Sequence, residues 1–136
     1  MEFQIREYKN YNRQEILALY QIAGWSNYTS DPDMLEEAYR HSLKIYAAYI
    51  EEKLIGVIRV TGDGYSVIVI QDILVFPEYQ RQGIGRALIR KILEEYQSVY
   101  QKILLTDNTP KTIQFYRSMG FSAVEDIECR ALIKMW

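Results

Sequence analysis

The sequence is poor in the residues that cross-link small domains or bind transition metals. Its 136 residues include one cysteine, Cys129, and one histidine, His41. A single cysteine excludes an intramolecular disulfide, and one histidine with one cysteine leaves almost no ligands for a zinc-type site. The apolar runs are also far shorter than the ~20 residues that a membrane span needs. We therefore expect a domain that folds on its hydrophobic core, with no metal and no membrane partner.

The sequence also has no excess of positive charge. The formal net charge is −2 and the sequence pI is about 5.5. This balance disfavours a nucleic-acid partner, whose phosphates require a basic face. The polar, mixed segment at residues 1–11 does not have the pattern of a signal peptide, which predicts a cytoplasmic protein.

What the sequence does contain is enough for one compact domain over residues 1–136. Hydrophobic residues make up 49% and charged residues 25%, and no linker or repeat divides the chain. Periodicity and turn residues predict strands at Phe3–Tyr8, Lys44–Ile50, Leu54–Val60, Val67–Val75, Lys102–Thr106, Ser122–Asp126 and Cys129–Met135. The same patterns predict helices at Arg13–Ala23, Asp33–Ser42, Arg86–Tyr96 and Lys111–Met119.

A glycine-bearing loop between a strand and a helix is the most informative feature. It reads Q-R-Q-G-I-G-R-A-L over residues 80–88. The first amides of a helix have no intrahelical partner and carry the positive end of the helix dipole, so they suit a phosphate. The spacing is not that of a P-loop, and Leu88 stands where a dinucleotide fingerprint needs its third glycine. The loop therefore predicts a phosphorylated ligand of another class.

A second motif follows at the next strand-to-helix junction. Thr109 suits an N-cap and Pro110 the first helical position, and Gly120 suits a helix stop. The segment ends F-Y-R-S-M-G-F at Phe121.

Together, I-L-V-F-P-E-Y with the adjoining Q-x-x-G-x-G, and the F-Y-R-S-M-G-F segment, resemble the GNAT superfamily of N-acetyltransferases. The resemblance covers about the last two thirds of the chain. It implies an α/β fold with a central mixed sheet and helices on both faces. It also implies transfer of an acetyl group from acetyl-CoA to a primary amine acceptor, by direct attack in a ternary complex. Since relatives are often dimers, a homodimer is a further expectation.

The resemblance assigns roles to particular positions. Backbone amides at Ile73, Leu74 and Val75 would bind the pantetheine arm and the thioester. Asn108 would bind the same arm, or serve only as a turn residue. The phosphates would lie on the loop, at Arg81, Gln82, Gly83, Ile84, Gly85 and Arg86.

The catalytic assignments are Tyr116 and Asp72. Tyr116 matches the family position whose hydroxyl can protonate the departing thiolate, although a tyrosine there can also simply pack a helix. Gln71 occupies the site where many relatives have an acid, and a glutamine cannot accept a proton. Asp72 is then either the base, directly or through water, or a structural carboxylate. The missing acid also leaves open an alternative function, a catalytically weak acyl-CoA-binding sensor or regulatory module.

Overall fold

The computed structural model describes residues 2–136. The strands are β1 (Gln4–Glu7), β2 (Lys44–Ile50), β3 (Lys53–Gly62), β4 (Val67–Val75) and β5 (Gln101–Leu104). The α-helices are α1 (Arg13–Ile22), α2 (Ser26–Thr29), α3 (Pro32–Arg40), α4 (Ile84–Glu95) and α5 (Pro110–Ser118). Short 3₁₀ turns lie at Pro77–Tyr79 and Val124–Ile127.

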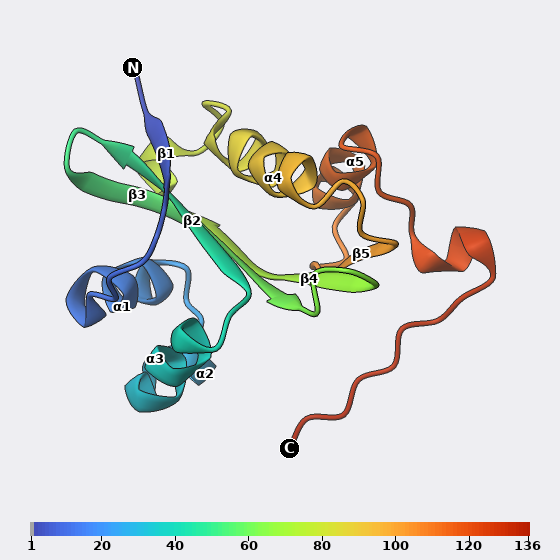
Figure 1. Cartoon of the computed structure of the whole chain (residues 1–136), viewed down its shortest axis with the longest axis horizontal. Coiled ribbons are helices and arrows are strands. Elements are labelled where there is room, and N and C mark those ends of the chain that lie inside the picture. Colours follow the sequence, from blue (N-terminus) through green and yellow to red (C-terminus); the bar gives the residue numbers. More distant parts are fainter. Residues whose placement is uncertain (1) are drawn as a thin grey trace. The chain divides into compact units, whose positions relative to one another are not determined.

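The five strands form one mixed sheet in the order β1-β2-β3-β4-β5 (Figure 1). The first four strands pair antiparallel, and β5 pairs parallel to β4. A parallel neighbour requires a crossover connection, which is supplied here by the segment that contains α4. The expected mixed sheet of an α/β protein is confirmed.

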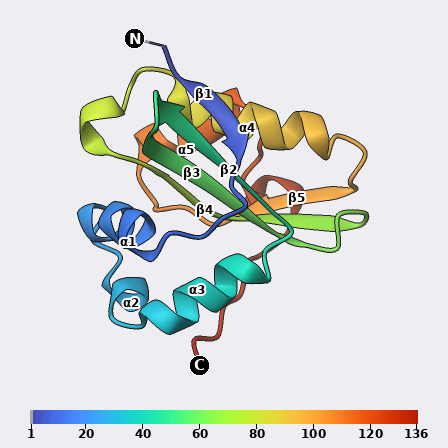
Figure 2. The ribbon, with the colours of Figure 1, turned by 60° about the vertical axis from the view of Figure 1, so that its left-hand side comes forward.

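Helices cover both faces of this sheet, as Figure 2 shows for α1 and α3 on one side and α4 on the other. Leu74 of β4 belongs to a buried core with Leu19 of α1 and Leu35 of α3. The next residue back along β4, Ile73, faces α4, because a Cβ built on Gly85 would lie 4.0 Å from its Cδ1. Adjacent strand residues thus serve two separate layers.

Side-chain caps set the starts of three helices, and the cap at Thr109 confirms the sequence prediction. Asn12, Asp31 and Thr109 each accept a hydrogen bond from a backbone N–H in the first turn of the helix that follows. Pro32 and Pro110 occupy the first helical position, where a missing N–H costs nothing. The helix bounds agree with the sequence prediction to within two residues for all but α2, which is too short to show a period.

The chain forms two compact units, which divide after Leu104. The first contains the sheet and α1–α4. The second, residues 105–136, contains α5, on which Tyr116 packs edge-to-face against Phe115 and Phe121 with ring centroids 5.1 and 6.0 Å away.

The predicted final strand pair is wrong. Ser122–Asp126 and Cys129–Met135 contain no strand, and Val124–Ile127 forms a 3₁₀ turn instead. Glu128 then takes a left-handed conformation with φ 59°, which interrupts any extended run. An alternating pattern shows that a segment could pair, but a strand forms only where a partner strand is present.

Across residues 2–136, no helix is both long enough and apolar enough to cross a bilayer.

Two isoleucines of α1 test the core assignment within one helix. Ile16 is fully buried, whereas Ile22 is 59% exposed. We expect Ile16→Ala to lower the free energy of unfolding by about 2–5 kcal/mol, through lost burial and a residual cavity. The matched variant Ile22→Ala should change it by less than about 0.5 kcal/mol. Urea titration of both variants checks this, and equal losses would contradict the assignment.

Candidate active site

A β-bulge lies in the middle of β4, and Gln71 is its extra residue. Arg59 of β3 pairs with Asp72, but the next residue, Val60, pairs with Ile70. The register therefore shifts by one residue, which leaves Gln71 without a directly opposed partner on β3. Bulges bend a strand and re-aim its side chains, so this one changes the course of β4 where it approaches the loop.

The pairing between β4 and β5 ends next to this bulge. The last registered pair is Ile70 with Leu104, and β5 ends there. Beyond it, residues 71–75 of β4 keep their β3 neighbour on one edge and have no strand partner on the other among the described residues. The strand therefore presents an open edge directly before the glycine loop.

The direction of the backbone amides on this edge follows from one hydrogen bond. Phe76 N–H donates to Ile55 O of β3 at 2.9 Å. Because peptide groups alternate in direction along an antiparallel strand, Leu74 also points to β3, whereas Ile73 and Val75 point to the open edge. Of the three amides assigned to the pantetheine arm, two thus face outward.

The glycine loop begins α4 without any side-chain cap. Gly83 is the N-cap, with φ 85°, and makes no side-chain capping hydrogen bond. This left-handed conformation suits glycine, and α4 opens with N–H groups available to a ligand. Arg81, at φ 63°, and Gln82 are exposed on the same loop.

Gln80 ties this loop to the open edge. Its Nε2 donates to Val75 O at 3.0 Å, so the outward carbonyl of the last strand residue is held by the first residue of the loop motif. At the other end of α4, Tyr46 Oη donates to the Glu95 carboxylate, and Lys44 Nζ lies 3.3 Å from Glu95 Oε2. The C-terminal end of α4 is thus fixed to β2, and the start of the loop before α4 is fixed to the end of β4.

Asp72 lies in a buried polar network on the face opposite α4. It is 2% exposed, and its Oδ2 accepts from Arg59 Nε and from Tyr20 Oη, both at 2.7 Å. The Tyr20 hydroxyl also lies 3.0 Å from the Tyr39 hydroxyl. Burial raises the pKa of Tyr20, and the Tyr39 and Asp72 oxygens raise it further, so this phenol stays protonated and donates a hydrogen bond to Asp72.

Gln71 is exposed to solvent, whereas the next residue, Asp72, is buried. Burial and then the Asp72 charge raise the pKa of Tyr28 of α2, which is half-buried, and the Arg59 charge opposes them.

Tyr116 and Asn108 belong to the second compact unit. Tyr116 is half-buried, and burial and then the Asp107 carboxylate raise its pKa. It is therefore protonated near neutral pH, as a proton donor must be. Asn108 is exposed just before the Thr109 cap. The structure thus brings the β4 edge, the loop and Asp72 together in one unit, and their assigned roles remain predictions.

Sequence reasoning missed Arg59, Tyr20 and Gln80. A lone arginine in the apolar run L-I-G-V-I-R-V was the available indication for Arg59, since a buried charge requires a partner. Tyr20 gave no comparable indication, because 12 tyrosines in the chain obscure any single one. In the part of the chain that the structure describes, no group of three or more His, Cys, Asp or Glu could hold a metal ion.

Comparison with known proteins agrees with this geometry. The family model described as an acetyltransferase (GNAT) domain matches residues 41–123, which include the bulge, the open edge and the loop. The chain belongs to the GNAT family. A GNAT family acetyltransferase from Streptococcus pneumoniae is 40% identical, with a TM-score of 0.90 over 98% of both chains.

Similarities of lower identity or shorter coverage include one solved structure and two plant proteins. A probable acetyltransferase from Staphylococcus aureus is 27% identical, with a TM-score of 0.80 over 98% of this chain and all of that one. The chloroplastic GCN5-related N-acetyltransferase 2 of Arabidopsis thaliana is 39% identical over 75 residues, or 54% of this chain. A histone acetyltransferase of Glycine max is 37% identical over the same length. The chain spans only 28% and 32% of the length of these two plant proteins.

The buried pair of Arg59 and Asp72 yields a stability prediction. Asp72→Asn leaves the buried guanidinium without its countercharge, so we expect the free energy of unfolding to fall by about 3–5 kcal/mol. The half-exposed pair of Arg117 and Asp126, at 2.8 Å, serves as the control. There, Asp126→Asn should cost less than about 1 kcal/mol. Denaturant unfolding measures both, and a small loss in Asp72→Asn would contradict a structural role for this carboxylate.

Proposed function

We propose that the protein transfers an acetyl group from acetyl-CoA to a primary amine, by direct attack in a ternary complex. The observation that carries the proposal is the open edge of β4, followed across a short loop by the N-terminus of α4, whose N-cap Gly83 makes no side-chain capping hydrogen bond. The N-terminus of α4 offers N–H donors for an anion, and the edge of β4 offers the outward amides of Ile73 and Val75. A ligand that fits both needs a phosphate group and an extended arm with amides of its own.

The first step is binding. The N-terminus of α4, with Gly83 and Gly85, would hold the pyrophosphate, and the exposed Arg81 would add positive charge. The amides of Ile73 and Val75 would bind the extended arm as an added strand would, because their N–H groups have no other strand partner on that edge. One of them would then be positioned to bind the thioester oxygen, where negative charge develops during attack.

The second step is proton movement. The amine nitrogen forms the new bond to the carbonyl carbon, the carbon–sulfur bond breaks, and the Tyr116 hydroxyl gives its proton to the departing sulfur. The proton lost by the amine must go elsewhere. Asp72 is poorly suited to take it, since its Oδ2 already accepts two short hydrogen bonds in a buried site. We assign Asp72 a structural role. The amine proton would pass instead to water at the exposed Gln71.

Binding of acetyl-CoA is tested at Gly85. In Gly85→Glu the added carboxylate lies at the helix N-terminus and repels the pyrophosphate, so we expect affinity for acetyl-CoA to fall at least about tenfold in calorimetric titration. Gln97→Glu adds the same charge at an exposed position beyond the other end of α4 and should bind like the wild type. NAD and ATP should not bind to either variant or to the wild type.

The result that contradicts the phosphate site is a Gly85→Glu variant with an unchanged melting temperature and wild-type affinity.

The proton-donor role is tested with Tyr116→Phe. We expect the rate of thiol release with a panel of primary amines to fall by about 10²-fold or more, with acetyl-CoA affinity unchanged. Tyr65→Phe is the matched control, because Tyr65 is 86% exposed and should turn over like the wild type. Unchanged turnover in Tyr116→Phe would exclude this role.

A second candidate function is an acyl-CoA-binding sensor or regulatory module. Gln71 at the position of a frequent family acid, beside the occupied Asp72, favours it. Tight binding of acetyl-CoA without thiol release for any amine would support this alternative over the enzyme.

A further inference from the structure

Gly56 of β3 lies beside the end of the open edge of β4. It pairs with Val75, the last residue of β4, on one side and with Ala48 of β2 on the other. It is buried within the sheet, because β3 has a strand neighbour on each edge. A glycine inside a strand weakens it and often marks a place where another backbone approaches closely.

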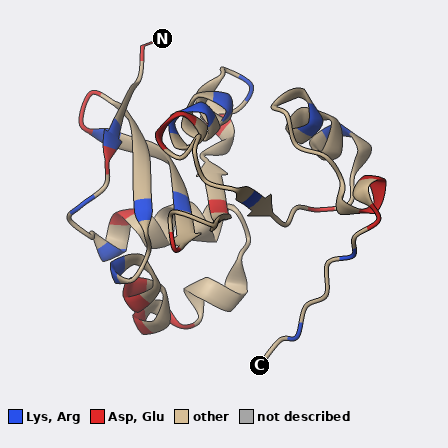
Figure 3. Cartoon of the chain, turned by 45° about the vertical axis from the view of Figure 1, so that its right-hand side comes forward, with Lys and Arg blue, Asp and Glu red and all other residues tan. Residues whose placement is uncertain are grey.

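Neither the backbone conformation nor a charge accounts for this glycine. Gly56 is not among the glycines with a positive φ, so any residue could adopt its conformation. No charged side chain takes up the space beside it, since Lys53 and Arg59 are the charged residues of β3 and both lie three residues away. Figure 3 shows the strands of the sheet largely tan, with isolated charges. Space is therefore the property that remains to explain Gly56.

The space beside Gly56 is taken by the backbone of β4. A Cβ built on Gly56 would lie 2.8 Å from Leu74 O and 3.2 Å from Val75 Cγ2. The side-chain contact could be relieved by a change of rotamer. The contact with Leu74 O could not, because a backbone oxygen moves only with its whole peptide group.

A second bulge accounts for this close approach. Ala48 pairs with Gly56, but the next residue of β2, Tyr49, pairs with Leu54, which leaves Ile55 as an extra residue on β3. Bulges bend a strand and increase its twist. Ile55 O also accepts from Phe76 N–H at 2.9 Å, so the bulge residue itself holds the end of β4 against Gly56.

The oxygen that Gly56 approaches belongs to the peptide group that the proposed function uses. Leu74 O and the N–H of Val75 lie in one planar peptide group and point in opposite directions. Since Leu74 O points to β3, the N–H of Val75 points to the open edge. The plane is rigid, so any displacement of the oxygen also displaces the N–H that would bind the ligand.

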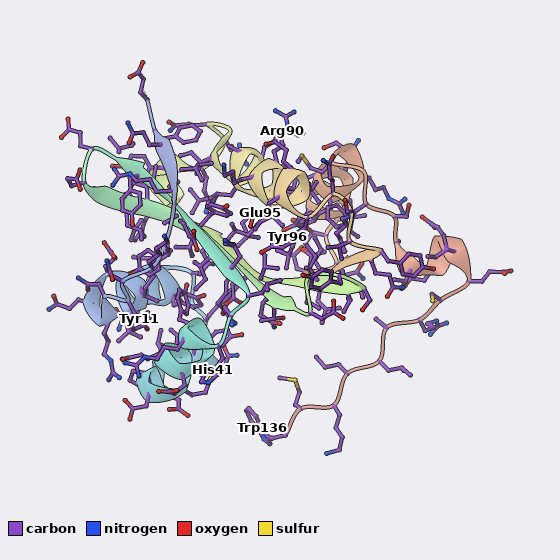
Figure 4. The ribbon with its side chains drawn as sticks, viewed as in Figure 1. Tyr11, His41, Arg90, Glu95, Tyr96 and Trp136 are labelled. Atoms are coloured by element: carbon purple, nitrogen blue, oxygen red, sulfur yellow. The ribbon has the colours of Figure 1, made fainter. Side chains whose placement is uncertain are left out.

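This peptide group is also the part of the structure that can yield. β3 is held between two strands, and α4 is fixed to β2 through Glu95, which is labelled at the C-terminal end of that helix in Figure 4. Residues 71–75 of β4 have a strand neighbour on one edge alone among the described residues. A methyl group at position 56 would therefore push the end of β4 outward.

We propose that Gly56 is a positioning residue for acetyl-CoA. Its missing side chain lets the peptide group between Leu74 and Val75 lie where the Val75 N–H meets the extended arm of the ligand. Gly56 makes no contact with the ligand and acts through the backbone of β4. This inference rests on the proposed function, because it concerns the same open edge.

The test is Gly56→Ala. We expect its affinity for acetyl-CoA in calorimetric titration to fall about fivefold or more, because one backbone hydrogen bond to the ligand is lost or misaligned. In the ligand-free ¹⁵N-labelled protein, the amide resonance of Val75 should move more than those of residues 67–70. Both measurements are made well below the melting midpoint of each variant.

Gly62→Ala is the matched control for loss of stability. Gly62 lies at the opposite end of the same ladder, where it pairs with Ile68, and a Cβ there would lie 2.5 Å from Val67 O. The same methyl group thus presses on the same strand away from the open edge. We expect Gly62→Ala to lower the melting temperature, to bind acetyl-CoA like the wild type, and to move the resonances of residues 67–70 more than that of Val75.

A double variant separates the backbone contact from the side-chain contact, and it carries the test if Gly56→Ala does not fold. Gly56→Ala with Val75→Ala removes the overlap with Val75 Cγ2 and keeps the overlap with Leu74 O. It should bind acetyl-CoA about fivefold or more weakly than Val75→Ala alone. Equal affinity of these two proteins would overturn the proposal.

Two further results would overturn it. One is a folded Gly56→Ala protein with wild-type affinity, and the other is an equal loss of affinity in Gly62→Ala. A wild type that does not bind acetyl-CoA would instead contradict the proposed function. In that case the ligand-free resonance of Val75 decides whether Gly56 sets the position of the edge, and an unmoved resonance would overturn that as well.

Discussion

The buried ion pair between Arg59 and Asp72 is the constraint on which the candidate site depends. Burying two charges is costly unless each is well paired, and here Asp72 also accepts from Tyr20. The pair fixes Arg59 and Asp72 directly opposite each other in the β3–β4 ladder. Val60, the residue after Arg59, pairs with Ile70. Between these two pairs β4 contains one residue more than β3, and that residue, Gln71, forms the bulge. A shift of this register would remove the partner of a buried charge.

The remaining features of the site follow from this position of the bulge. β4 leaves β5 at Ile70, directly before it, and the strand continues alone on that edge for five residues. The Gln80 side chain donates a hydrogen bond to the outward carbonyl of Val75 and so connects the edge to the loop. The network therefore sets the direction of the backbone along the open edge. The Asp72 carboxylate beside the bulge already accepts hydrogen bonds from Arg59 and Tyr20 in a buried site, which fits a structural role.

The sequence predicted helix caps and turns well, but it predicted poorly the contacts that join residues far apart in the chain. The Thr109 cap and the Gly83 turn depend on residues within one helical turn, so their geometry follows from local chemistry. The partner of Asp72 could not be derived in this way, because Arg59 lies 13 residues away and the bulge is a property of two strands together. The prediction of strands at 122–126 and 129–135 failed for the same reason. Alternation within one segment does not supply the partner strand that pairing requires.

The most direct test of the account is residue-specific nuclear magnetic resonance of the ¹⁵N-labelled protein during titration with acetyl-CoA. The alternation of β4 predicts large shifts for the amides of Ile73 and Val75 and for Gly85 at the start of α4. The amides of Leu74 and Asp72, which point to β3, should shift much less. Equal shifts along residues 72–75, or shifts confined to other parts of the protein, would contradict an open β4 edge as the binding surface.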